Sequence, residues 1–266
     1  MNTTRIPQHR VAESVAAELR ARILSAGGED YQLPTQDQLM TEFGVSHPSI
    51  REAIRILETE GLVTVRRGKV GGAEVHRPDE SSAAYHLGLA LQGGQVTLRD
   101  LAGGLQLLEP LCSAECARRP DRLETVVPAL LANVEASAAL VGDGVAFTRV
   151  AREFHDLVVG FTPSATVRYL ISSLVALWSA QEQSWAEIVT RRGVYPSANE
   201  AGSVVRVHRR IMGEIAAGNA EEARRVAASH LAASQALLLD QFDDGVVSAA
   251  PARQRQAVKS PSYSRI

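Results

Sequence analysis

The sequence has few cysteines, no long apolar run and almost no net charge, and each of these absences excludes a class of protein. Two cysteines in 266 residues cannot build a disulfide framework, and no apolar run is long enough to cross a bilayer. Residues 1–10 are polar and do not resemble the apolar core of a signal peptide. A net charge of −2 argues against a protein that coats DNA non-specifically. We therefore expect a cytoplasmic protein with no membrane partner, in which Cys112 and Cys116 are buried thiols.

What is present begins with two adjoining helix patterns in the first third of the chain. Thr35 followed by Gln38 is the signature of a capping box, which begins a short helix. Ser46 is suited to N-cap the next helix, in which apolar residues recur at helical spacing. Arg51 and Arg55 lie four residues apart on the other side of that helix. Arginines opposite a buried apolar face are typical of a DNA recognition helix.

A short basic hairpin pattern follows the two helices. Residues 62–65 and 73–76 have strand composition, and the turn between them contains Arg67, Gly68 and Lys69. A basic hairpin after a helix-turn-helix indicates a winged helix, whose wing contacts the DNA backbone or the minor groove. The alternative for this turn is a solvated hairpin tip with no DNA contact.

The pattern changes after residue 77. Polar residues over 78–90 predict a linker, and apolar residues at helical spacing over 91–243 predict an all-helical bundle of six or seven helices. Residues 244–266 lack periodicity and predict a disordered tail. The expected fold class is therefore mostly α, with a winged helix-turn-helix over 8–77 followed by the bundle.

Several motifs of the first domain match one known family. They are Leu33-Pro34-Thr35, Gly44-Val45-Ser46, Ile50-Arg51-Glu52-Ala53-Ile54-Arg55, Gly61-Leu62 and the Arg67-Gly68 turn. Together they closely resemble the GntR family of bacterial transcriptional regulators. The resemblance implies that Arg51 contacts the operator and that Gly68 enters the minor groove. The full set of expected DNA-binding residues is Thr35, Gln36, Ser46, His47, Ser49, Arg51, Arg55, Arg67, Gly68 and Lys69.

Two positions depart from the pattern of that family. His47 stands where the family usually has arginine, and Gln36 and Asp37 stand where the preceding helix usually has arginine or glutamate. An imidazole cannot make the forked hydrogen bond that arginine makes to guanine. We therefore expect a palindromic operator with an altered base preference.

The second domain carries a further resemblance through Phe154-His155, His208 and His230. These residues resemble the FCD-type ligand domain of the FadR subfamily, in which three histidines hold a divalent metal. Neutral imidazoles suit zinc or nickel, and open coordination positions would accept a ligand carboxylate. The resemblance also implies an aspartate ligand at the position of Ala151.

The expected effector pocket consists of Leu105, Leu108 and Ala151. The family resemblance implies an arginine that pairs with a carboxylate effector, and its aligned position here is Leu105. Because both Leu105 and Ala151 replace charged residues, we expect a less polar pocket that takes an acyl or acyl-CoA-like effector.

The patterns together predict a regulator and not an enzyme. We expect a ligand-responsive repressor that binds double-stranded DNA as a homodimer. One alternative is a winged-helix regulator whose second domain only dimerises. A remote alternative is a metal hydrolase that uses the three histidines, but Glu153 and Asp156 fall off the histidine face and leave it without a general base.

Overall fold

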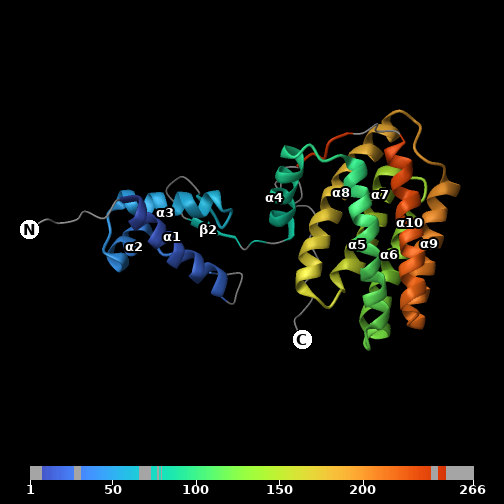
Figure 1. The fold of residues 1–266 in the computed structure, drawn as a ribbon, viewed down its shortest axis with the longest axis horizontal. Coiled ribbons are helices and arrows are strands. Elements are labelled where there is room, and N and C mark those ends of the chain that lie inside the picture. The colour runs from blue at the N-terminus through green and yellow to red at the C-terminus, as the bar shows by residue number, and fades with distance from the viewer. Residues whose placement is uncertain are drawn as a thin grey trace, which may run out of the picture. The chain divides into compact units, whose positions relative to one another are not determined.

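The chain divides into two compact units, residues 1–79 and 80–266. The structure is a computed structural model, and it describes residues 8–26, 31–65, 73–76, 78, 80–240 and 245–249. Figure 1 shows the elements of both units, each of which is described here by itself. Within these described ranges, no helix is both long enough and apolar enough to cross a membrane.

The first unit is a winged helix-turn-helix, as the sequence predicts. Its two strands pair antiparallel, with Val63 opposite Val75 and Val65 opposite Ala73. The turn between them, residues 66–72, lies outside the described part of the chain. The elements of this unit are α1 (Gln8–Ser25), α2 (Gln36–Phe43), α3 (His47–Thr59), β1 (Val63–Val65) and β2 (Ala73–Val75).

Local hydrogen bonds set the boundaries of α2. The backbone N–H of Gln38 donates to Thr35 Oγ1 at 3.3 Å, and the N–H of Thr35 donates to Gln38 Oε1 at 2.9 Å, which confirms the predicted capping box. Gly44 ends α2 with a φ of 61°, a left-handed conformation that favours glycine. The capping box therefore begins α2 and Gly44 ends it, so that only a tight turn separates α2 from α3.

The start of α3 differs from expectation in one detail. Ser46 occupies the N-cap position, but its side chain makes no capping hydrogen bond. Its hydroxyl lies 3.1 Å from the hydroxyl of Ser49, so the two side chains pair with each other. The predicted N-cap position is therefore correct, and the predicted cap bond is wrong.

The core of the first unit fixes which face of α3 is exposed. Helix α1 packs against α3, and Leu19, Ile50 and Leu57 are fully buried between the elements of this unit. Arg20 Nε donates to Glu60 Oε2 at 2.8 Å across the same pair of helices. Because the apolar face of α3 is buried, its polar face is left to solvent.

The second unit is an all-helical bundle. Its described residues form seven α-helices and one π-helical turn, which agrees with the six or seven helices predicted. Helices α5 and α10 pack side by side, as do α7 and α8 (Figure 1). The elements are α4 (Glu80–Gly93), α5 (Leu98–Arg118), η1 (Arg122–Val126), α6 (Val127–Ala139), α7 (Gly144–Gly160), α8 (Ala165–Arg191), α9 (Ala198–Ala217) and α10 (Ala220–Leu239).

The predicted linker is largely a helix. Residues 80–90 belong to α4, which packs against α8 with Ala84 buried. Gly88 lies so close to α8 that an added Cβ would meet Leu177 Cδ2 at 2.8 Å. The linker prediction is wrong there. The polar residues at the start of α4 suggested a linker, whereas its apolar residues pack against α8 in the folded unit.

The predicted disordered tail begins with an ordered segment. Val247 is fully buried, and its N–H donates to Val96 O at 2.9 Å. The N–H of Leu98 in turn donates to Gly245 O at 2.8 Å. The tail prediction is therefore wrong for residues 245–249, and its remainder from residue 250 lies outside the described residues.

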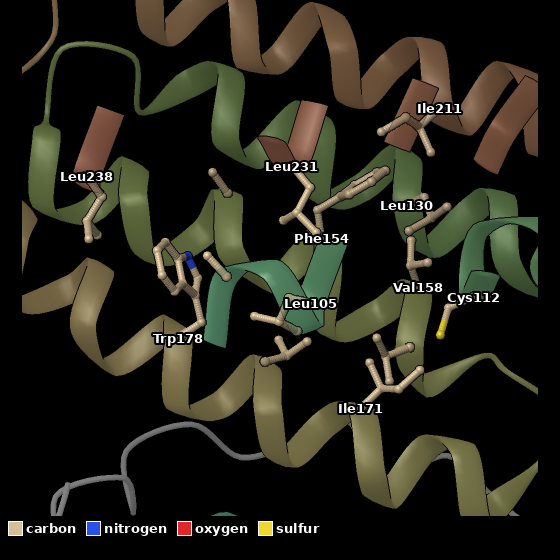
Figure 2. Close-up of a cluster of buried hydrophobic side chains, with 14 of the residues drawn as sticks. Leu105, Cys112, Leu130, Phe154, Val158, Ile171, Trp178, Ile211, Leu231 and Leu238 are labelled. Carbon is tan, nitrogen blue, oxygen red and sulfur yellow. The ribbon is translucent and has the colours of Figure 1, made fainter. Parts of the chain in front are cut away.

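One large apolar cluster fills the bundle. Figure 2 shows Leu105, Phe154 and Trp178 among its members, contributed by α5, α7 and α8. Leu105 is fully buried in this cluster. The side chains of α5, α7, α9 and α10 that meet beside the cluster form the polar site described next.

Candidate functional site

The exposed face of α3 carries the residues expected to bind DNA. Arg51 and Arg55 are both exposed, and Arg55 lies 3.6 Å from Glu52 on the same helix. His47 is exposed and its Nε2 lies 3.2 Å from Asp37 Oδ1 of α2. Arg51 forms no ion pair with any described residue. Its guanidinium is therefore exposed and is not held by a neighbouring carboxylate of the described residues.

The other expected DNA-binding residues differ in how available they are. Ser49 is buried, with 4% of its surface exposed, and its hydroxyl faces Ser46. A DNA contact by Ser49 is therefore not supported, because its side chain points into the unit. Thr35 and Ser46 are exposed and Gln36 is half-buried at the start of α2. Arg67, Gly68 and Lys69 lie outside the described residues.

Three helices bring the predicted histidines of the second unit together. His155 comes from α7, His208 from α9 and His230 from α10, and all three are buried. One nitrogen from each lies within 4.8 Å of the others. The Nε2 atoms of His208 and His230 are 2.9 Å apart, so these two rings share one hydrogen bond. Residues 75 positions apart in sequence thus form one cluster, which we call the histidine triad.

Neighbouring side chains orient the triad. The ring of Phe154 stacks on His208, with centroids 4.1 Å apart and planes at 7°. His155 Nδ1 forms a hydrogen bond with Glu109 Oε1 of α5. Glu109 is buried, and sequence reasoning missed it as a site residue. Its spacing of four residues from Leu105 places it on the buried face of α5, and that was the signal available in the sequence.

Burial sets the charges in the site. Burial and the neighbouring His230 lower the pKa of His208 well below its usual value, and burial and His155 lower the pKa of His230 to about 3. Burial alone would raise the pKa of Glu109, but His155 and Arg152 outweigh it and hold that pKa below its usual value. His208 and His230 are therefore neutral and Glu109 is ionised at neutral pH. Neutral imidazoles are the form that binds metal.

The triad could hold a metal ion. Three imidazole nitrogens leave coordination positions open for water or a ligand. A carboxylate bonded to the second nitrogen of a metal-binding histidine is a common supporting contact, and Glu109 makes that contact to His155. Ala151 offers no ligand, as expected. The described residues therefore provide a triad that could hold a metal, with a carboxylate behind it.

A pocket of about 420 Å³ opens beside the triad. Its walls include the three histidines, Ala151 and Trp185. Leu105 and Leu108 do not line it, because Leu105 is buried in the apolar cluster and Leu108 is partly exposed elsewhere on α5. Two of the three predicted pocket residues are therefore wrong.

The lining of the pocket includes charged side chains as well as apolar ones. Arg152 and Glu182 both line it, and Arg152 Nε lies 3.3 Å from Glu182 Oε2. Arg210 and Arg225 line it as well. These four charged side chains therefore lie beside an apolar wall that includes Phe147 and Trp185.

The shifted histidines predict a pH dependence of stability in metal-free protein. His230 has a folded-state pKa of about 3 against an ordinary value of 6.5, so below pH 6.5 the unfolded chain binds a proton that the folded chain does not. The stability contributed by this histidine is full above pH 6.5 and is lost as the pH falls towards 3. Between pH 7 and pH 5.5 we expect a loss of about 1 kcal/mol from His230, and the lowered pKa of His208 adds a loss in the same direction.

Urea unfolding of protein treated with a chelator would measure this loss. The range above pH 5.5 avoids the titration of ordinary carboxylates. In His230→Gln the free energy of unfolding should fall less between pH 7 and pH 5.5 than it does in the wild type. Equal free energies of unfolding at both pH values would contradict neutral, buried histidines.

Family models match both units of the chain. The model described as bacterial regulatory proteins, gntR family, matches residues 11–71, and the FCD domain model matches residues 105–233. The solved structure of Streptococcus agalactiae GntR covers 86% of this chain and 99% of its own, with a TM-score of 0.61 and 19% identity. At that identity the likeness shows the fold alone.

Curated relatives match part of the chain. The HTH-type transcriptional repressor NanR of Edwardsiella tarda (strain FL6-60) is 31% identical over 157 residues, which is 57% of this chain and 58% of that protein. NanR of Klebsiella aerogenes is 37% identical over 87 residues, or 32% and 33% of the two chains. These alignments span less than two thirds of either relative. On its two matched domains, the chain belongs to the GntR family of bacterial regulatory proteins and carries an FCD domain.

Proposed function

We propose that this protein is a ligand-responsive transcriptional repressor that binds a palindromic operator as a homodimer. One observation carries the proposal: a winged helix-turn-helix with an exposed arginine face is joined in one chain to a bundle with a pocket beside a histidine triad. The first unit supplies sequence recognition and the second supplies a place for a small molecule. The names of the NanR relatives support repression. The family match supports a regulator over an enzyme.

Exposed leucines on α5 support the homodimer. Leu107 is 77% exposed, and Leu108 and Leu111 lie on the same helix with large exposed fractions. Contiguous apolar surface of this kind commonly marks a protein interface. Two-fold symmetry of the dimer would place two recognition helices on inverted half-sites, so a palindromic operator follows from it.

The effector we propose is a small molecule with an acyl body. Phe147, Ala151, Trp185 and Val204 give the pocket an apolar wall, and its volume lies in the range of small-molecule sites. Zinc or nickel in the triad would add an open coordination position at one end. Binding of the effector would shift the populations of two arrangements of the protein, one of which holds DNA better.

One observation favours a second candidate, a regulator whose bundle only dimerises. The hydrogen bond between His208 and His230 satisfies one nitrogen of each ring without any metal. This candidate predicts no stabilisation by metals or metabolites in a thermal-shift screen, whereas the proposed function predicts stabilisation by at least one of them. A metal hydrolase has less support, because Glu109 is bonded to His155 and is not free to act as a base.

Selection from a random double-stranded DNA library would test operator binding. We expect enrichment of an inverted repeat whose half-sites are about one helical turn apart, with binding that weakens as salt rises. A mobility-shift assay on the enriched sequence gives the affinity. A reporter gene that carries the same sequence shows whether the protein represses or activates transcription. Enriched pools without a repeat would contradict the dimeric operator, and activation of the reporter would contradict repression.

A further inference from the structure

Asp37 and His47 meet at the end of the helix-turn-helix where α3 begins. Asp37 comes from the first turn of α2, and His47 is the first residue of α3. Asp37 Oδ1 lies 3.2 Å from His47 Nε2, although the two side chains are 87% and 51% exposed. The contact therefore joins the two helices of the motif through a pair of polar groups that solvent, or DNA, can reach.

This pair lies at the part of the motif that meets DNA. In a helix-turn-helix the N-terminal residues of the second helix contact base edges in the major groove. Arg51 follows His47 by four residues, so the two side chains lie on one side of α3. Both are exposed, whereas Ile50 and Leu57 of the same helix are fully buried. Asp37 is therefore beside the end of α3 that reads bases.

The carboxylate of Asp37 is positioned from both helices. It lies in the first turn of α2, where the helix dipole favours a negative charge. A carboxylate accepts hydrogen bonds and donates none, so the His47 nitrogen that faces it is the one that carries a proton. Among the described residues, His47 is the single ion-pair partner of Asp37. The carboxylate is thus held at one oxygen and keeps acceptor capacity for a group outside the unit.

An acceptor at this place distinguishes the bases. In the major groove cytosine presents the N4 amino donor, whereas guanine presents the N7 and O6 acceptors. Adenine also has an amino donor, but its N7 acceptor lies next to it, and thymine presents an acceptor and a methyl group. The negative charge also repels phosphate, so Asp37 adds nothing to non-specific affinity. A carboxylate here therefore favours cytosine.

We propose that Asp37 is a base-specificity residue of this regulator and accepts a hydrogen bond from the N4 amino group of a cytosine in each operator half-site. His47 is its positioning residue. The inference rests on the proposed function, since it names a base within the proposed operator. Arg51 and Arg55 can only donate hydrogen bonds, so Asp37 adds an acceptor to a surface of donors. The two chemistries select different bases and together restrict the half-site.

Base preference along the operator tests this assignment. The operator selected from the random library is resynthesised with each base pair in turn at every half-site position, symmetrically in both half-sites. Full-length protein is titrated with each duplex in a fluorescence anisotropy assay at one salt concentration. At one position we expect cytosine to bind about tenfold or more tightly than the other bases, which is a typical cost of a mismatch. Asp37→Ala should reduce that preference to about twofold or less and leave the other positions unchanged.

Further variants separate recognition from positioning. His47→Ala should weaken the cytosine preference, and His47→Gln, whose amide can donate to Asp37, should recover part of it. Glu42→Gln is the matched control, because Glu42 is an exposed acid at the other end of α2 and pairs with Arg22 of α1. It should keep the preference within about twofold of that of the wild type.

The outcomes distinguish this inference from the proposed function. Thermal unfolding of every variant shows whether it is folded, and we expect the wild-type Tm because both side chains are exposed. A base profile that Asp37→Ala leaves unchanged, or a lost preference for a base other than cytosine, overturns the role of Asp37. A cytosine preference that His47→Ala does not weaken overturns the positioning role. Those results leave a repressor that binds its operator intact, whereas a selection that enriches no inverted repeat contradicts the proposed function.

Discussion

Replacing Arg51 by alanine is expected to abolish specific operator binding while leaving the fold unchanged. Arg51 is exposed on α3 and forms no ion pair with the described residues, so its removal leaves no buried partner unsatisfied. A bidentate contact from arginine to a base is worth about 1–3 kcal/mol of discrimination. With one contact in each half-site, the loss is roughly 100-fold or more. Titration of the selected operator in a fluorescence anisotropy assay would measure it.

The control for Arg51 is an arginine of similar exposure in the other unit. Arg224 lies on α10 and pairs with Glu221, so Arg224→Ala should bind the operator as the wild type does. Arg55→Ala provides a second comparison, because a phosphate contact weakens binding to all sequences alike. Specific binding retained by Arg51→Ala would move base recognition to Ser46, His47 and the wing.

Zinc is expected to stabilise metal-free protein by a large amount. A ligand that binds only the folded state at about 1,000 times its Kd adds about 4 kcal/mol, which for a domain of this size raises Tm by roughly 10 °C. The triad supplies three ligands and Glu109 supports one of them. Thermal unfolding of chelator-treated protein, with and without added zinc or nickel, would measure the shift, and elemental analysis would show the metal content.

Three variants test where the metal binds. His230→Gln keeps a hydrogen-bonding side chain beside His208 but removes the imidazole, and it should lose most of the zinc shift. Glu109→Gln removes the carboxylate behind His155 and should weaken zinc binding by about 10- to 100-fold. His86→Ala changes an exposed histidine of α4 and should behave as the wild type. A wild type that shows no zinc shift would favour histidines that serve only as a structural pair.

The first unit was largely predictable because its signals are local. The capping box at Thr35, the turn at Gly44 and the apolar spacing of α3 each depend on residues within one or two turns of helix. The hydrogen bond between the hydroxyls of Ser46 and Ser49, which forms in place of an N-cap bond, was not predictable in the same way. Both an N-cap bond and a side-chain pair satisfy the Ser46 hydroxyl, and the sequence does not distinguish them.

The second unit was predictable in class but not in detail. Helix α4 was mistaken for a linker because its apolar face becomes apparent only against α8. The pocket was predicted to include Leu105, by its position within a family pattern, and Leu108, yet Leu105 is buried in the core and neither residue lines the cavity. Glu109 and Arg152, which carry charge at the site, lie on helices whose rotation about their own axes is set by packing.

The sequence by itself determined that this chain has a winged helix-turn-helix, an all-helical second domain and three histidines suited to a metal. Helical periodicity and capping chemistry are encoded by near neighbours, so they can be read from residues alone. Only the tertiary structure decided that α7, α9 and α10 bring the histidines within 4.8 Å, that Glu109 supports His155, and that Arg152 is buried with Nη2 unpaired among the described residues. These contacts join residues far apart in the chain, and the burial that shifts their pKa values and leaves Nη2 without an acceptor exists only when the helices are packed together.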